Sequence, residues 1–270
     1  MNRRMKEEVS IVIGEASMKR VVNGTLNAYR QYRALKAKSK AYKVLRYSVI
    51  SIFAAYLLTI CFPQYLFAHE VGYQHFKVYS RDPFDPHVYK VLDDAEGRLS
   101  RSTIYDREVS RRVFLTNSHG MYAFLSNKAF RSFANSVPFI NNIVINKADV
   151  GRDLVFLNRP QHNQRSLSGV IAHEVTHLFI RKKLGTWRAS WLPTWKNEGY
   201  CEYIARDTTI TFEEGVRLWK ENPNDDTQYR YFKYQMMVKY LLETEKLSIE
   251  DVFNRDFDLK ELEVKVFRSL

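Results

Sequence analysis

Cysteine is almost absent from this chain. Cys61 and Cys201 are the only two among 270 residues, which excludes a disulfide-stabilised scaffold and a zinc module built on cysteines alone. Ten glycines and seven prolines are too few for a collagen-like or low-complexity protein. Hydrophobic residues make up 45% of the chain, so a wholly disordered protein is also excluded. The length suits one large domain or two small ones.

Acidic residues are scarce at the N-terminus. Residues 1–46 contain twelve lysines and arginines but three glutamates, a net charge of +9 out of +12 for the whole chain. Because the remainder is nearly balanced, the high isoelectric point is weak support for nucleic-acid binding, and we expect no nucleic-acid partner. Tyrosines recur at helical spacing among the cations of residues 26–46, which predicts an amphipathic helix. It either contacts anionic lipid headgroups or only sets membrane topology.

Charge is missing altogether from residues 47–68. As a helix this stretch is about 33 Å long, close to the thickness of a bilayer's hydrocarbon core. A buried core helix is not favoured, because such a helix usually keeps a polar face and this stretch has none. A cleaved signal peptide is not favoured either, because its basic region is usually shorter than the one here. A hairpin in the membrane interface stays an alternative. We predict a transmembrane signal anchor at 47–68 in contact with membrane lipid. By the positive-inside rule the arm 1–46 is cytoplasmic, and residues 70–270 form an extracytoplasmic domain of a single-pass cell-membrane protein.

Hydrophobic periodicity divides the rest of the chain into short strands and longer helices. Alternating or β-branched runs predict strands at 76–80, 112–116, 142–146 and 153–157. Helical periodicity predicts helices at 86–100, 166–183, 195–207 and 229–243. Residues 122–136 fit either a helix or a covering loop. A few strands followed by helices predict an α+β fold.

The first of the late helices contains a metal-binding pattern. Residues 173–177 read H-E-V-T-H, and two histidines four residues apart lie on one face of a helix, where both imidazoles can ligate one cation. Glu174 lies beside the pair, where it can take a proton from a water at the metal. Glu198, twenty-one residues after His177, can supply a third ligand from a second helix and leave one position open.

Two neighbours of Glu198 have different predicted roles. Glu202 lies on the same helical face as Glu198, and its carboxylate can accept the outer N–H of a ligating histidine. Cys201 has a spacing from Glu198 that does not favour ligation, so we predict a small buried residue there.

The motif pair HEVTH and WKNEGYCEY, residues 195–203, resembles the gluzincin group of zinc metallopeptidases. That group includes thermolysin and the membrane alanyl aminopeptidase family, and the resemblance covers about residues 166–207. It implies a zincin-like catalytic domain, in which a short mixed sheet packs on the active-site helix behind an N-terminal transmembrane helix. It also implies that His173, His177 and Glu198 ligate Zn²⁺ and that Glu174 is the catalytic base. Glu202 is implied as the carboxylate behind one of the ligands.

The chain also departs from these families. No G-x-M-E-N motif precedes the helix, so aminopeptidase specificity is not supported. The group often places a tyrosine or histidine from a later helix beside the oxyanion of the intermediate. Four tyrosines are available, namely Tyr229, Tyr231, Tyr234 and Tyr240. We choose Tyr234 because residues 234–243 resemble the helix that follows the family's site; a tyrosine that only packs its helix on the core is the alternative.

These patterns predict a membrane-anchored zinc metallopeptidase that hydrolyses peptide or protein substrates with a metal-activated water. The sheet predicted within residues 76–157 would offer its edge to an extended peptide. One alternative is a non-catalytic, zinc-stabilised binding domain of a membrane protein. The presence of Glu174 argues against it, since a structural zinc site does not need this residue. A second alternative is a membrane-surface or nucleic-acid adaptor that acts through residues 1–46.

Overall fold

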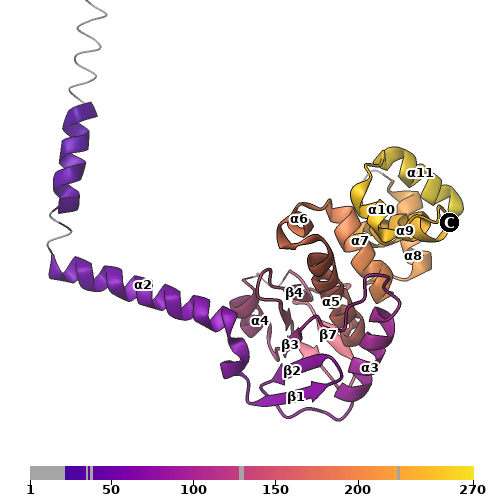
Figure 1. Ribbon diagram of the computed structural model, residues 1–270, viewed down its shortest axis with the longest axis horizontal. Coiled ribbons are helices and arrows are strands. Elements are labelled where there is room, and N and C mark those ends of the chain that lie inside the picture. The colour runs from indigo at the N-terminus through magenta and orange to yellow at the C-terminus, as the bar shows by residue number, and fades with distance from the viewer. Residues whose placement is uncertain (1–21, 35, 37–38, 128–130, 224–225) are drawn as a thin grey trace, which may run out of the picture. The chain divides into compact units, whose positions relative to one another are not determined.

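The computed structural model describes residues 22–34, 36, 39–127, 131–223 and 226–270 (Figure 1). The chain divides into two units, residues 1–58 and residues 59–270. In the first unit, residues 22–34 are helical and a second helix, α2, begins at Lys40. The amphipathic helix predicted at 26–46 is therefore divided, and residues 1–21 of the predicted basic arm lie outside the described residues.

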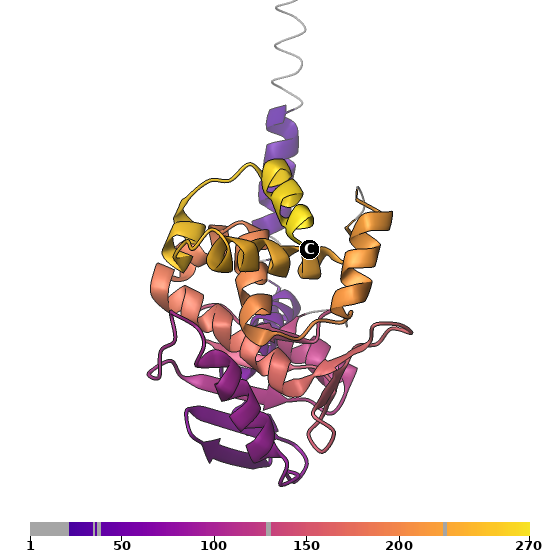
Figure 2. The same ribbon diagram turned by 90° about the vertical axis from the view of Figure 1, so that its right-hand side faces the viewer.

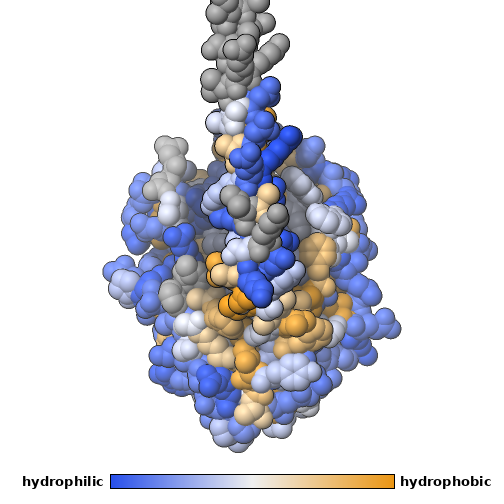
Figure 3. Space-filling model, turned by 90° about the vertical axis from the view of Figure 1, so that its left-hand side faces the viewer, coloured by the Kyte–Doolittle hydropathy of each residue, from blue (hydrophilic) through white to orange (hydrophobic). Residues whose placement is uncertain are grey.

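Helix α2 (Lys40–Cys61) is the one helix in the described part of the chain that is long and apolar enough to cross a membrane. None of its residues is buried within the protein. Figure 3 shows one face of the molecule, on which hydrophobic side chains gather in one area. The helix ends earlier than residue 68, because Pro63 cannot continue it and Pro63–Leu66 form a 3₁₀ turn, η1. The span predicted at 47–68 thus ends seven residues too late.

A five-stranded mixed sheet forms the base of the second unit, in the order β1-β2-β3-β5-β4. Its strands are β1 (His69–Tyr73), β2 (Phe76–Ser80), β3 (Arg111–Leu115), β4 (Ala134–Ser136) and β5 (Asn142–Ile145). The three central strands are parallel, and the edge strands β1 and β4 are antiparallel to their neighbours. Val78, Val113 and Ile143 lie side by side across the centre and are fully buried, as suits parallel strands covered on both faces.

A small antiparallel sheet and a series of helices complete this unit. The sheet consists of β6 (Ala148–Asp149), β7 (Leu154–Phe156) and β8 (Gln164–Ser166). The helices are α3 (Val88–Leu99), α4 (His119–Ser126), α5 (Leu167–Leu184), α6 (Thr186–Trp191), α7 (Thr194–Ala205), α8 (Phe212–Glu221), α9 (Arg230–Glu243), α10 (Ile249–Asn254) and α11 (Leu259–Ser269). Figures 1 and 2 both place α5 between the large sheet and the helices that follow. Helix α7 packs on α5, and α9 packs on α7.

The α+β class predicted from the sequence is confirmed. Each strand and helix predicted in the second unit is present, with ends that differ by one or two residues. The ambiguous stretch 122–136 contains the end of α4 and the edge strand β4, with residues 128–130 between them outside the description. The sequence reading missed β1, the short strands β6 and β8, and four helices: α6, α8, α10 and α11.

A buried arginine joins the sheet to the helices on one of its faces. Arg111 of β3 is 1% exposed, forms an ion pair with Glu96 of α3, and lies against the rings of Phe76, Tyr105 and Phe179. Since Phe179 belongs to α5, this one side chain contacts both helices that cover the sheet. The metal-binding pattern in α5 therefore has a fixed position above the sheet.

Candidate metal centre

Helix α5 begins and ends where the sequence signals place it. The hydroxyl of Ser166 accepts a hydrogen bond from the backbone N–H of Gly169, which satisfies one donor of the first turn. Ser168 instead donates its hydroxyl and backbone N–H to the carboxylate of Asp153. Gly185 ends the helix with a φ of 79°, a conformation that suits glycine. These contacts fix the position of the H-E-x-x-H segment along the helix.

The two histidines of that segment face the third predicted ligand on α7. His173 Nε2 lies 3.2 Å from one carboxylate oxygen of Glu198, and His177 Nε2 lies 3.7 Å from the other. Two ligand atoms that share a tetrahedral zinc are about 3.3 Å apart. The spacing of these atoms therefore fits ligands of one small cation.

The outer nitrogen of each imidazole faces an oxygen atom on α7. His177 Nδ1 lies 3.0 Å from Asn197 Oδ1, and His173 Nδ1 lies 3.3 Å from Glu202 Oε1. His173 Nδ1 is buried and has no aligned hydrogen-bond partner among the described residues. Ligating histidines usually donate this outer N–H to an oxygen, which orients the ring. Asn197 and Glu202 are in place to do so.

Glu202 is itself held by an arginine that the sequence reading missed. Arg165 donates to both carboxylate oxygens of Glu202, at 2.9 and 2.8 Å, and also contacts the carboxylate and backbone carbonyl of Asp207. The side chains of Arg165 and Glu202 are almost fully buried, so these contacts are shielded from solvent. The guanidinium therefore neutralises a carboxylate that lies behind His173.

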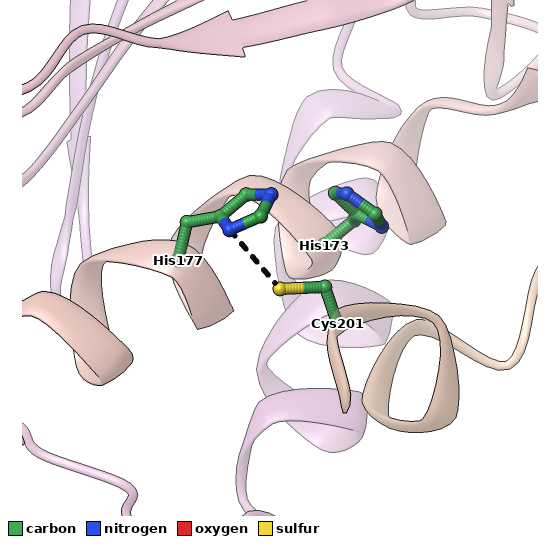
Figure 4. A group of neighbouring side chains, drawn as sticks. All are labelled: His173, His177 and Cys201. Atoms are coloured by element: carbon green, nitrogen blue, oxygen red, sulfur yellow. Dashed lines mark hydrogen bonds between the residues drawn. The ribbon is translucent and has the colours of Figure 1, made fainter. Parts of the chain in front are cut away.

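Cys201 is a second candidate for the third ligand. A ligand atom from each of His173, His177 and Cys201 can be chosen so that all lie within 4.8 Å of one another. Figure 4 shows both imidazoles projecting from α5 above the thiol, with Cys201 Sγ 3.3 Å from His177 Nδ1. This is the ring nitrogen that faces Asn197, whereas Nε2 faces Glu198. A metal bound through Cys201 would therefore displace the Asn197 contact.

The ligand set with Glu198 and the set with Cys201 differ in their access to a cavity. The cavity has a volume of about 910 Å³ and is lined by His173, Glu174, His177, Glu198 and Glu202. Cys201 is fully buried and is not among the lining residues. Both candidate sets share His173 and His177, but all three residues line the cavity only in the set with Glu198.

Burial and charge set the protonation of the three candidate ligands. Burial alone would lower the pKa of His173, but Glu202 and Glu198 outweigh it and raise this pKa to about 10. Burial would raise the pKa of Glu198, but the charges of His177 and His173 and a hydrogen bond from His173 lower it to about 2. Burial lowers the pKa of His177. In the metal-free protein at neutral pH, a proton on His173 thus balances the carboxylates.

The thiol of Cys201 has the opposite tendency. Burial, followed by the charges of Glu198, Glu174 and Glu202, raises its pKa well above the usual value. Metals bind the thiolate, so Cys201 would have to release its proton to become a ligand. The interpretation of Cys201 as a small buried residue agrees with its position.

The remaining predicted residues differ in how they meet the cavity. Glu174 is buried beside the histidines and lines the cavity. Tyr234, predicted as the oxyanion donor, is not among the lining residues, because it lies where α9 packs closely on Gly199 of α7. Tyr231, one turn earlier on the same helix, does line the cavity. The hydroxyl of Tyr229 is occupied by the backbone carbonyl of Asn222.

No protein-family model matches this chain, and no curated protein matches it. The case for the site therefore rests on its motifs and its geometry.

Two substitutions separate the two candidate ligand sets. We expect Glu198→Gln to lose zinc affinity by more than the roughly 10–100-fold that follows loss of a residue behind a ligand, because a charged ligand is removed. We expect Cys201→Ala to keep one equivalent of zinc, measured by metal analysis of the purified full chain after dialysis. The reverse pattern would show that the thiolate is the ligand and Glu198 is not.

Zinc binding should also release a proton. The pKa of His173 is about 10, so its imidazole is protonated at neutral pH, and it must become neutral to bind a metal. We expect release of about one proton per metal, and an affinity that rises about tenfold per pH unit through the neutral range. Calorimetry in buffers of different ionisation enthalpy measures the proton count. A binding enthalpy that is the same in every buffer would show that His173 is already neutral.

Proposed function

We propose that this chain is a membrane-anchored zinc-dependent peptidase with a zincin-like catalytic domain. The observation that carries the proposal is the convergence of His173 Nε2 and His177 Nε2 on the carboxylate of Glu198, with Glu174 on the same cavity wall. These residue types and positions match the motif of the gluzincin metallopeptidases. Zinc would be held by the two histidines and Glu198.

Zinc held by His173, His177 and Glu198 would supply Lewis-acid chemistry and a more acidic water. Glu174 accepts the proton of the attacking water and passes it to the leaving amine, as a general base and then a general acid. Asn197 and Glu202 hold the imidazoles of His177 and His173 in the orientation that presents Nε2 to the cavity. Arg165 keeps Glu202 ionised while it does so.

Tyr231 takes the place of Tyr234 as the proposed oxyanion donor. Partial burial, and then the negative charges of Glu198 and Glu202, raise the pKa of Tyr231 to about 12. Its hydroxyl therefore stays protonated at neutral pH and is able to donate a hydrogen bond. A donor aimed at the developing charge of a tetrahedral intermediate typically lowers the barrier by a few kcal/mol, about 3–4.

The substrate chain is proposed to bind along β4. This strand lies at one edge of the sheet, contacts α5 and lines the cavity through Ala134, Asn135 and Ser136. An extended peptide can add to such an edge as a further strand. Arg181 of α5 donates from Nη1 to the backbone carbonyl of Ser136, which fixes the strand relative to the H-E-x-x-H segment.

Membrane anchorage through α2 is part of the same proposal. Its length and composition suit a span. The excess of lysine and arginine before it favours a cytoplasmic N-terminus, which would place the catalytic domain outside the cytoplasm.

Substitution of Glu174 separates the peptidase from a zinc-stabilised binding domain. We expect Glu174→Gln to keep zinc and the fold, and to slow hydrolysis of an unstructured protein by about 10²–10⁴-fold, because the amide cannot take the water's proton. Rates are measured at equal zinc content.

Glu250→Gln makes the same chemical change at an exposed ion pair with Lys183, away from the cavity, and should hydrolyse at the wild-type rate. A wild-type rate for Glu174→Gln would contradict the mechanism. Absence of hydrolysis in every variant and in the wild type would favour the binding domain.

A further inference from the structure

Three large aromatic side chains project into solvent beside the cavity. They are Phe139 in the turn between β4 and β5, and Trp187 and Trp191 on α6, which are 65%, 73% and 83% exposed. Phe139 packs edge-on against Trp187 with ring centroids 5.6 Å apart. We call these three residues the aromatic rim. Phe139 also has a φ of 67°, a backbone conformation that costs free energy for a bulky residue. Because its ring is exposed, packing in the protein core does not compensate for this cost.

The rim is continuous with the mouth of the cavity. Pro138 lines the cavity directly before Phe139, and Ala189 and Ser190 line it directly before Trp191. A surface that covers the rim therefore also faces the entrance to the metal centre.

The rim lies close to the end of α2. The side chain of Asn142 donates to the backbone carbonyls of Ile60 and Cys61, at 3.1 and 3.3 Å, and so caps the last turn of that helix. Asn142 follows Phe139 by three residues, a reach of about 10 Å at most. Seven residues separate Cys61 from the first residue of β1. The rim therefore lies close to the point where the chain leaves α2.

The chemistry of the rim fits a lipid–water interface. Tryptophan prefers the headgroup level of a membrane, where its ring is buried and its N–H stays hydrated. Lys182 and Arg188 are exposed on either side of Trp187 in the sequence and can meet anionic headgroups. The segment that leaves α2 adds three more exposed apolar side chains: Phe62, Tyr65 and Leu66.

We propose that the aromatic rim inserts into the interface of the bilayer that α2 spans, so that the cavity opens at the membrane surface. If the chain is the proposed peptidase, its substrates are polypeptide segments that lie at, or emerge from, the same membrane. This substrate class rests on the proposed function. Lipid insertion itself does not depend on hydrolysis.

Tryptophan fluorescence in vesicles tests the insertion. The other two tryptophans, Trp195 and Trp219, are buried, so only the rim is open to quenching from outside the protein. The full chain is reconstituted in phosphatidylcholine–phosphatidylglycerol vesicles with or without bromine on the acyl chains. We expect brominated lipid to quench the tryptophan fluorescence of the wild type. The fluorescence of Trp187→Phe/Trp191→Phe should be the same in both kinds of vesicle. Equal emission of the wild type in both kinds of vesicle would overturn the proposal.

A relocated tryptophan provides the matched control. Val264 on α11 is 48% exposed, and Val264→Trp in the Trp187→Phe/Trp191→Phe background places an exposed indole on another helix. We expect no quenching by brominated lipid for this variant. Quenching as strong as in the wild type would mean that tethering by α2 alone accounts for the signal, which would overturn the role of the rim.

The substrate class is tested by a ratio of two rates. One peptide is supplied free in solution or attached to lipid in the same vesicles, and both forms are incubated with wild type and with Phe139→Ser/Trp187→Ser/Trp191→Ser. We expect the ratio of tethered to free cleavage to fall in the variant. An unchanged ratio would overturn the assignment of membrane-surface substrates. Loss of both rates in the wild type, with quenching intact, would instead contradict the peptidase.

Discussion

The apposition of α5 and α7 is the constraint on which the site depends. Glu198 of α7 lies between the imidazoles of two α5 residues, and Glu202, one turn later, lies behind the first of them. Gly199 makes this position of α7 attainable, because a Cβ there would lie 2.5 Å from the backbone carbonyl of Tyr234 on α9. Helix α7 is thus held between α5 and α9 with no room for a side chain at Gly199. Gly199, directly after Glu198, is therefore required by the packing of α7 against α9.

Several charged groups are buried around this contact, and Glu202 and Glu198 each have a specific charged neighbour. Arg165 pairs with Glu202 and Asp207, while a proton on His173 balances Glu198 in the metal-free protein. A divalent cation in place of that proton would add one net positive charge at the cavity. An arrangement of this kind would be costly as a purely structural feature, because buried charges lose their hydration. It fits a site whose purpose is to hold a metal.

The parts of the candidate site that could be predicted from the sequence are those whose residues lie close together along the chain. His173, Glu174 and His177 share one helical turn, so helix geometry alone places them together. Glu198 was predicted as a third ligand from a second helix and from the family resemblance, whereas helix geometry alone does not bring two helices together. Arg165 and Asn197 were not predicted, and Arg165 precedes α5 in a short strand without periodicity. Tyr231 was among the four candidate tyrosines, and the choice between Tyr231 and Tyr234 depends on which face α9 turns to α7. The strand β4 was ambiguous because three residues carry too little pattern.

The central claim is that nitrogen and oxygen atoms of His173, His177 and Glu198 hold the metal. X-ray absorption at the zinc edge, measured on the full chain loaded with one equivalent, tests this directly because sulfur scatters differently from nitrogen and oxygen. The account predicts a first shell of nitrogen and oxygen atoms at about 2.0–2.2 Å without sulfur. A sulfur ligand at about 2.3 Å would contradict it and would assign the third position to Cys201.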